Sequence, residues 1–253
     1  MTPRYRVLSL DLHDTIAWDT EAIVDAQYAV RLNRLAERLR MSSGDPVLLE
    51  ELRRARAALH EEWKRDGMSP ETIPLVIQVD LIRQRLGAQY AGDPESAVLG
   101  YAEGGLKEHP AQINPEAQAL IRSLNDRRFP VIVTTNTSRS GSAWKLSLEE
   151  AGGFRVTDVI ASTDVGACKP DPRVFSEVVR STGVPAAAIL HVGDSWVMDV
   201  EGARRFGMGA ALYRGLSQHY WEADEAREGP KLKDSSVPCL DHLSEVVGLL
   251  GLT

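Results

Sequence analysis

The sequence predicts an α/β fold in which helices cover both faces of a parallel sheet, with a helical insertion after the first strand. From residue 115 onward, stretches of helical periodicity alternate with short apolar runs, whereas between an early apolar run and residue 111 only helical periodicity occurs. Strands that alternate with helices of about ten or more residues indicate a parallel sheet. With 253 residues, 43% of them hydrophobic, the chain is long enough for one large or two small domains.

The part before residue 111 begins as a strand and continues as amphipathic helices. Residues 7–10 form an apolar run that ends at Asp11, as expected for a fully buried strand. Apolar side chains then recur every three or four residues in three stretches: Val24, Tyr28, Leu32, Leu35 and Leu39; Leu48, Leu52, Ala55, Leu59 and Trp63; and Leu75, Val79, Ile82, Leu86 and Tyr90. Side-chain acceptors before a proline mark helix starts at Asp45-Pro46, Ser69-Pro70-Glu71 and Asp93-Pro94-Glu95. We therefore interpret residues 16–110 as a helical domain inserted into a core formed by residues 1–15 and 111–253.

The second part of the core begins with a helix start at Asn114-Pro115-Glu116. The expected helices cover residues 115–127, 140–151, 172–182, 196–206 and about 240–250. The expected strands cover residues 130–135, 157–161, 188–192 and 209–213. Together with residues 7–10 these strands would form the parallel sheet.

Composition and charge exclude several classes of partner. A net charge of −7, a pI near 5.4 and the lack of a basic tract argue against nucleic acid, whose binding depends on clustered Lys and Arg. No apolar stretch is long enough for a signal peptide or a membrane span, so we expect a cytoplasmic protein with no membrane partner. The two cysteines, Cys168 and Cys239, have no metal-binding or redox spacing and are expected to be reduced.

Four short segments carry the polar chemistry, and each follows an apolar run. They are Asp11-Leu12-His13-Asp14-Thr15, Val133-Thr134-Thr135-Asn136, Cys168-Lys169-Pro170-Asp171-Pro172 and Gly193-Asp194-Ser195-Trp196-Val197-Met198-Asp199. In parallel sheets, ligands bind outside the carboxyl ends of the strands. An acid, a hydroxyl, a lysine and a second pair of acids should therefore meet at one edge of the sheet, which predicts a site for phosphoryl transfer.

These residue types suit that reaction. The carboxylate of Asp11 could attack phosphorus and form an acyl-phosphate, which divides one difficult displacement into two easier ones. Mg²⁺ prefers oxygen ligands and would relieve the repulsion between Asp11 and Asp194. Thr135 could donate to the phosphoryl oxygens, and the Lys169 ammonium would stabilise the charge that develops there.

The four segments resemble the motifs of the haloacid dehalogenase-like hydrolase superfamily, and the resemblance extends over the whole chain. The family's Asp-x-Asp-x-Thr motif matches Asp11, His13 and Thr15, and its strand-ending Ser or Thr, often followed by Asn, matches Thr135 and Asn136. Its Lys before Pro-Asp-Pro matches Lys169, and its Gly-Asp with a later Asp matches Gly193, Asp194 and Asp199. Four motifs in order are far more specific than any one of them alone.

The resemblance implies a Rossmann-like core with a helical cap of the type inserted between the first and second motifs. It also implies that Asp11 is the nucleophile and that Thr135, Asn136 and Lys169 bind the phosphate. Mg²⁺ would be held by the Asp11 carboxylate, the main-chain carbonyl of His13 and the Asp194 carboxylate. Asp199 would belong to the metal site by orienting a metal-bound water or Lys169. The cap would close over the site and select a small phosphorylated substrate.

His13 departs from the family motif, in which an Asp at this position protonates the leaving oxygen and then activates water. An imidazole performs both kinds of proton transfer in principle. Nearby carboxylates and phosphate should favour its protonated form, a good acid but a poor base. Our hypothesis is that His13 is the leaving-group acid of a slow or selective phosphatase; a passive role for this ring is the alternative.

Other interpretations remain open at this stage. The same carboxylate could cleave a carbon–halogen bond, or the protein could bind a phosphometabolite without turnover. Asp199 could equally be a surface acid in the first turn of a helix. Tyr28, Trp63 and Tyr90 are expected in the core, and no role is assigned to His60, His109, His191 and His219. The sequence predicts neither the physiological substrate nor the oligomeric state.

Overall fold

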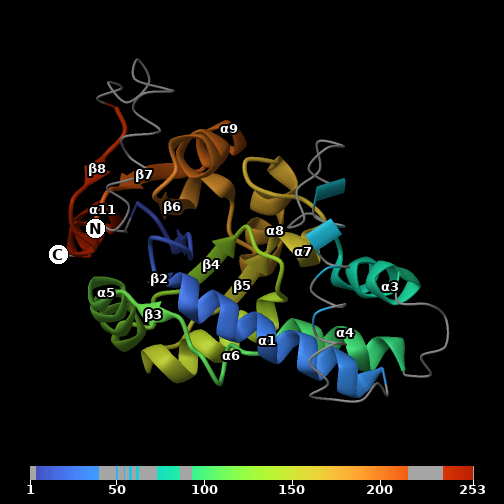
Figure 1. Cartoon of the computed structure of the whole chain (residues 1–253). Helices are drawn as coiled ribbons and strands as arrows, with labels where there is room; N and C mark the ends of the chain where they lie inside the picture. Colours follow the sequence, from blue (N-terminus) through green and yellow to red (C-terminus); the bar gives the residue numbers. More distant parts are fainter. Residues whose placement is uncertain are drawn as a thin grey trace.

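The core of the computed structural model is a six-stranded sheet in the order β5-β4-β1-β6-β7-β8, with every pair of neighbours parallel (Figure 1). The structure describes residues 4–39, 50, 54, 57–58, 61–62, 73–85, 93–215 and 236–252. The strands are β1 (Val7–Leu10), β4 (Val131–Thr135), β5 (Asp158–Ala161), β6 (Ile189–Gly193), β7 (Gly209–Tyr213) and β8 (Cys239–Leu240). This arrangement confirms the predicted α/β fold.

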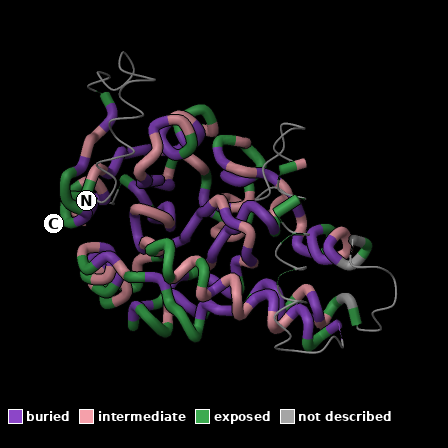
Figure 2. The backbone as a smooth tube through the Cα atoms, viewed as in Figure 1, coloured by how far each residue is buried: buried purple, intermediate pink, exposed green. Residues whose placement is uncertain are grey.

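Helices cover both faces of the sheet because its side chains are apolar on both faces. Leu8 and Leu10 pack with buried side chains of α5 (Pro115–Asp126), α6 (Gly141–Gly152) and α11 (Val246–Leu250). Val7 belongs to a second cluster, with α8 (Pro172–Thr182), η3 (Trp196–Glu201) and α9 (Gly202–Phe206). Successive side chains of a strand point to opposite faces, so the apolar run of β1 stabilises two layers at once. Figure 2 shows the buried residues gathered in the strands and on the helix faces that contact them.

The helices before residue 111 have a small core of their own. The helices with described bounds in this part are α1 (Glu21–Arg38), α3 (Leu75–Arg85) and α4 (Pro94–Glu103). Leu32 and Leu35 of α1 pack with Val79 of α3 and Tyr101 of α4, all of them buried. Beside the sheet, β2 (Ala17–Trp18) pairs antiparallel with β3 (Gln112–Ile113), so the chain enters and leaves this helical part at neighbouring points. Its interpretation as a separate domain of residues 16–110 stays a prediction.

Most of the expected elements of the core are found where the sequence places them. The start signals at Asp93 and Asn114 are confirmed: each side chain accepts a main-chain N–H of its helix, from Ser96 at 2.9 Å and from Glu116 at 3.0 Å. The expected helix 196–206 begins as a π-helix, η3, before it becomes α9. The stripe from Leu48 to Trp63, the caps at Asp45 and Ser69, and Leu86 and Tyr90 lie outside the described residues.

The expected final helix over about residues 240–250 is wrong in its first part. Cys239 and Leu240 pair with Leu212 and Tyr213 as the edge strand β8. A short 3-10 turn, η4 (Leu243–Glu245), then leads into α11. By pairing with β7, Cys239 and Leu240 gain main-chain hydrogen bonds as well as burial. Helical spacing of apolar residues does not predict such pairing at an open sheet edge. Elsewhere, none of the described helices combines the length and the apolar character that a membrane crossing requires.

Candidate active site

The carboxyl ends of three adjacent strands bring the predicted acids and the hydroxyl together. Asp11 follows β1, Thr135 is the last residue of β4, and Asp194 follows the last residue of β6. β1 lies between β4 and β6, and the chain builds β4 and β5 on one side before it crosses to β6 and β7 on the other. Such a reversal of strand order opens a crevice at the carboxyl ends of the strands. The predicted edge of the sheet is therefore the edge at which these residues meet.

Lys169 joins two of the acids. Its side chain is 2% exposed, and its ammonium donates to Oδ1 of Asp11 and, at 2.6 Å, to Oδ1 of Asp199. Asn136 fixes the main chain of this lysine: its Oδ1 accepts from Lys169 N at 2.8 Å, and its Nδ2 donates to Lys169 O at 3.2 Å. Asn136 thus positions the loop that carries Lys169. The Thr135 hydroxyl, fully buried beside it, donates to Asn136 O at 3.4 Å.

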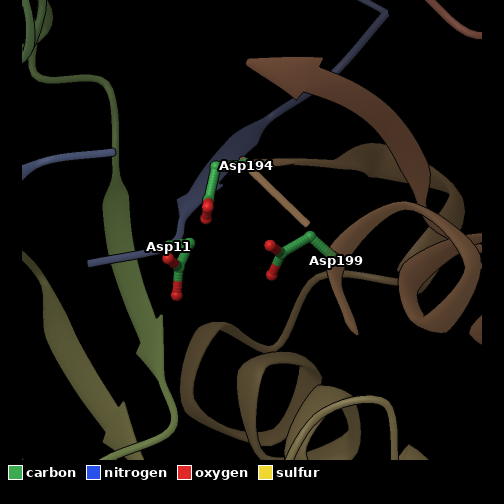
Figure 3. Close-up of side chains that lie close together, drawn as sticks. All are labelled: Asp11, Asp194 and Asp199. Carbon is green, nitrogen blue, oxygen red and sulfur yellow. The ribbon is translucent and has the colours of Figure 1, made fainter. Parts of the chain in front are cut away.

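Three carboxyl groups lie within reach of one ion. Oxygen atoms of Asp11, Asp194 and Asp199 all lie within 4.8 Å of one another. Figure 3 shows Asp11 and Asp194 entering from the strand ends and Asp199 from the opposite side, with their carboxyl groups turned toward a common point. These are three of the residues predicted to hold the metal, and oxygen ligands of this kind suit Mg²⁺.

The electrostatics of this cluster favour a cation. Burial, helped by the charges of Asp11 and Asp199, raises the pKa of Asp194 to about 9. Burial also raises the pKa of Asp11 to about 6, although the Lys169 ammonium opposes this effect. Burial alone would lower the pKa of Lys169, but Asp11 and Asp199 hold it above its ordinary value. One ammonium among three carboxyl groups leaves repulsion that a divalent ion would relieve, so these residues fit a magnesium site.

Two further groups, neither of them predicted from the sequence, hold the Asp199 carboxylate in place. Its Oδ1 lies 3.0 Å from His191 Nε2, and its Oδ2 accepts from the main-chain N of Ser195 at 3.0 Å. A carboxylate only accepts, so His191 donates through Nε2, and its Nδ1 can accept from the Ser9 hydroxyl at 2.8 Å. Burial would raise the pKa of Asp199, but Lys169 and the His191 hydrogen bond hold it well below its usual range. With Asp199 1% exposed, its interpretation as a surface acid is wrong.

His13 lines a cavity of about 150 Å³. The imidazole meets the Trp144 ring edge-on, with 5.4 Å between ring centroids. The other lining residues are Asp19, Val24, Gln27, Tyr28, Asn136, Thr137, Ser138 and Arg139. Tyr28 was expected in the core but lines this cavity, because α1 turns that side of its apolar stripe toward the loop after β4.

The surroundings of His13 do not favour the protonated ring that the sequence led us to expect. Burial lowers the pKa of His13 and outweighs the opposing effects of Asp19 and Asp14. The expectation of a protonated ring was based on neighbouring carboxylates and a bound phosphate; burial exceeds the effect of the carboxylates here. The ring is therefore biased toward the neutral form, in which one nitrogen is free to accept a proton.

Comparisons with known proteins agree with this geometry. A family model described as haloacid dehalogenase-like hydrolase matches residues 5–207. Over 245 residues the chain is 29% identical to human haloacid dehalogenase-like hydrolase domain-containing protein 3, a match that covers 94% of this chain and 92% of that protein. The mouse protein of the same name is 30% identical over 55% of this chain and 53% of its own length.

Two further likenesses concern enzymes that are named for their activities. Glyceraldehyde 3-phosphate phosphatase of Methanopyrus kandleri is 28% identical over 51% of this chain and 54% of that protein. The match to the mouse protein and the match to the Methanopyrus kandleri enzyme each span about half of the relative's length. Among solved structures, a 2-haloacid dehalogenase from Pseudomonas syringae superposes with a TM-score of 0.60 at 23% identity, over 98% of this chain and 99% of that one, which demonstrates a shared fold.

Proposed function

Since this chain belongs to the haloacid dehalogenase-like hydrolase family, we propose that it is a magnesium-dependent phosphatase that hydrolyses a small phosphomonoester through an aspartyl-phosphate on Asp11. The observation that carries the proposal is the position of the Lys169 ammonium between Asp11 and Asp199, with Asp194 in the same cluster of carboxyl groups. The phosphatase names of relatives such as the Methanopyrus kandleri enzyme support the choice of reaction.

In the first step, an oxygen of Asp11 attacks phosphorus, and the bond between phosphorus and the ester oxygen breaks. Lys169 holds the attacking carboxylate in place and neutralises charge on the phosphoryl oxygens. The Thr135 hydroxyl would donate to one of these oxygens in place of its long bond to Asn136 O. His13 gives a proton to the departing oxygen; because burial biases the free ring toward the neutral form, this is the proton that it took from water in the preceding turnover. The carboxylates of Asp11 and Asp194 and the carbonyl of His13 would hold Mg²⁺, which would draw charge from the phosphoryl oxygens when bound.

In the second step, water attacks the phosphorus of the aspartyl-phosphate. The bond between phosphorus and the Asp11 oxygen breaks, which restores the carboxylate and releases inorganic phosphate. His13 takes the proton that the water loses, and this proton serves the next leaving group. Asp199, fixed by His191 and by the Ser195 main chain, keeps Lys169 aligned during both steps.

The proton donated by His13 should matter most when the leaving oxygen is basic. We expect His13→Gln to lower kcat/KM for an alkyl phosphate by about 10²- to 10⁴-fold, whereas p-nitrophenyl phosphate, whose leaving group departs as a stable anion, loses far less. Parallel kinetics on the two substrates measure this difference. His13→Asp should restore the alkyl phosphate rate, and His109→Gln, at an exposed histidine, is the matched control. Equal losses on both substrates would contradict the role of His13 as an acid.

The pKa values of the acids predict how magnesium affects stability. Because the pKa of Asp194 rises from 3.8 to about 9 on folding, the metal-free folded protein binds an extra proton in this interval and loses stability as the pH rises through it. Mg²⁺ must displace this proton, so the increase in Tm on adding Mg²⁺ should be larger at about pH 8.5 than at about pH 6. Thermal unfolding at both pH values measures this. Asp194→Asn should reduce the pH dependence to the part that Asp11 contributes, and a pH-independent increase in the unsubstituted protein would contradict the proposed site.

Carbon–halogen cleavage by Asp11 is the alternative within the same family. It makes no use of a cation, whereas the cluster of Asp11, Asp194 and Asp199 fits one. Release of halide from a 2-haloacid without added metal, together with no release of phosphate from p-nitrophenyl phosphate, would favour this alternative. Phosphate binding without any turnover would instead favour a binding protein.

A further inference from the structure

The cavity that His13 lines shares two residues with the proposed active site. His13 and Asn136 are among its lining residues, and Asn136 is the residue that holds the main chain of Lys169. Its volume of about 150 Å³ is half of the lower limit for pockets that hold drug-sized ligands, about 300 Å³. A group that leaves phosphorus near His13 would extend into this space, so the cavity suits the small remainder of a phosphomonoester.

The wall of the cavity also contains a buried cation whose hydrogen bonds go to neutral acceptors. Arg139 is 5% exposed; its guanidinium donates to Gly104 O at 2.7 Å and to Gln27 Oε1 at 2.8 Å, both of them neutral acceptors. Among the described residues, no carboxylate forms an ion pair with it. A guanidinium has five N–H donors, so these two bonds leave part of its capacity for a ligand.

A second arginine adds to the positive charge. Arg31 is fully buried; it donates to Tyr101 O at 2.9 Å and to Ser138 O at 2.7 Å, and within the described part of the chain it too lacks a carboxylate partner. Burial, followed by the charge of Arg31, lowers the pKa of Arg139 to about 9. A buried charge without a counter-charge is costly, so an anion beside Arg139 would be stabilised.

The one carboxyl group in the wall does not cancel this excess. Asp19 accepts from Gln27 Nε2 at 3.3 Å, and burial raises its pKa, which weakens its tendency to carry charge. The positive charge of two buried guanidinium groups is therefore opposed by a single carboxyl group, and the pKa of that group is raised. Gln27 connects the two sides, because its amide accepts from Arg139 and donates toward Asp19.

We propose that Arg139 binds a second anionic group of the substrate, so that the preferred substrates are small phosphomonoesters whose leaving portion carries a carboxylate or a further phosphate. The inference builds on the proposed phosphatase function and adds the class of substrate. A carboxylate or phosphate a few bonds from the ester oxygen would reach Arg139 while the ester oxygen lies at His13, and both form charge-assisted pairs with a guanidinium.

Matched substrates test this proposal. With Mg²⁺ present, 2-carboxyethyl phosphate and propane-1,3-diyl bisphosphate are compared with propyl phosphate, which has the same chain without the second anion. For at least one of the two anionic substrates we expect kcat/KM to exceed that of propyl phosphate by about ten- to a hundredfold, mainly through KM. The substrate whose kcat/KM exceeds that of propyl phosphate identifies the group that Arg139 recognises, a carboxylate or a phosphate.

Variants assign the preference to Arg139. Arg139→Gln should bring the ratio of kcat/KM values close to one, Arg139→Lys should keep part of it, and Arg180→Gln, at a surface arginine paired with Glu177, should leave it unchanged. A ratio near one in the unsubstituted protein overturns the proposal without any variant having to fold, as does a ratio that Arg139→Gln leaves intact. If p-nitrophenyl phosphate and all three substrates are inert, the phosphatase function itself fails.

Discussion

Asp11→Asn is expected to lower kcat for p-nitrophenyl phosphate by at least about 10⁴-fold, because an amide oxygen does not replace a carboxylate as the nucleophile. The fold should survive. Burial already raises the pKa of Asp11 to about 6, so a neutral side chain is tolerated at this position, and Lys169 keeps its bond to Asp199. Initial rates with Mg²⁺ and thermal unfolding of the same samples measure the two effects separately.

Asp14→Asn is the matched control for this substitution. Asp14 lies three residues along the chain but outside the carboxylate cluster, and its φ of 57° is a conformation that asparagine tolerates well. The control should retain the rate within a few-fold. A residual rate in Asp11→Asn close to that of the control would show that phosphorus is attacked by something other than Asp11.

Lys169→Met is expected to damage both stability and activity. Without the ammonium, Asp11 and Asp199 remain buried with no charge to balance them, which typically costs about 3–5 kcal/mol of unfolding free energy. The rate should fall by about 10²- to 10³-fold, because the positive charge beside the transferred phosphoryl group is lost. Urea unfolding and initial rates measure the two losses.

Added Mg²⁺ should recover part of the stability of Lys169→Met but not its rate, because the ion restores positive charge without restoring the position of the ammonium. Lys107→Met, at an exposed lysine, should change neither quantity. If Lys169→Met unfolds at the same urea concentration as the unsubstituted protein, the ammonium does not balance the two acids.

The sequence was sufficient to place the predicted site residues at one edge of the sheet because three of the four motifs follow or end an apolar strand. The Lys169 motif is separated from β5 by α7 (Ser162–Val165). Asp11, Thr135 and Asp194 follow or end the strands β1, β4 and β6, so recognising the strands locates the side chains. Lys169 was found through the Pro-Asp-Pro that follows it, where Asp171 caps α8. Local information of this kind does not depend on how helices pack.

The supporting residues depend on tertiary contacts that no local pattern carries. His191 occupies an ordinary position in an apolar strand, and its partner Ser9 is 182 residues away in the chain. The wall of the cavity forms only where α1 meets the loop after β4, which brings Gln27 to Arg139 across 112 residues. Tyr28 was assigned to the core because periodicity identifies an apolar stripe but not which part of it faces a cavity.

The central claim is that Asp11 receives the phosphoryl group, and a crystal structure of the protein with Mg²⁺ and beryllium fluoride tests it most directly. Beryllium fluoride mimics a phosphoryl group bonded to a carboxylate. We predict beryllium bonded to an Asp11 oxygen, Mg²⁺ held by Asp11 and Asp194, and Lys169 contacting a fluoride. Beryllium fluoride bonded to another residue, with Asp11 still free of it, would contradict the account.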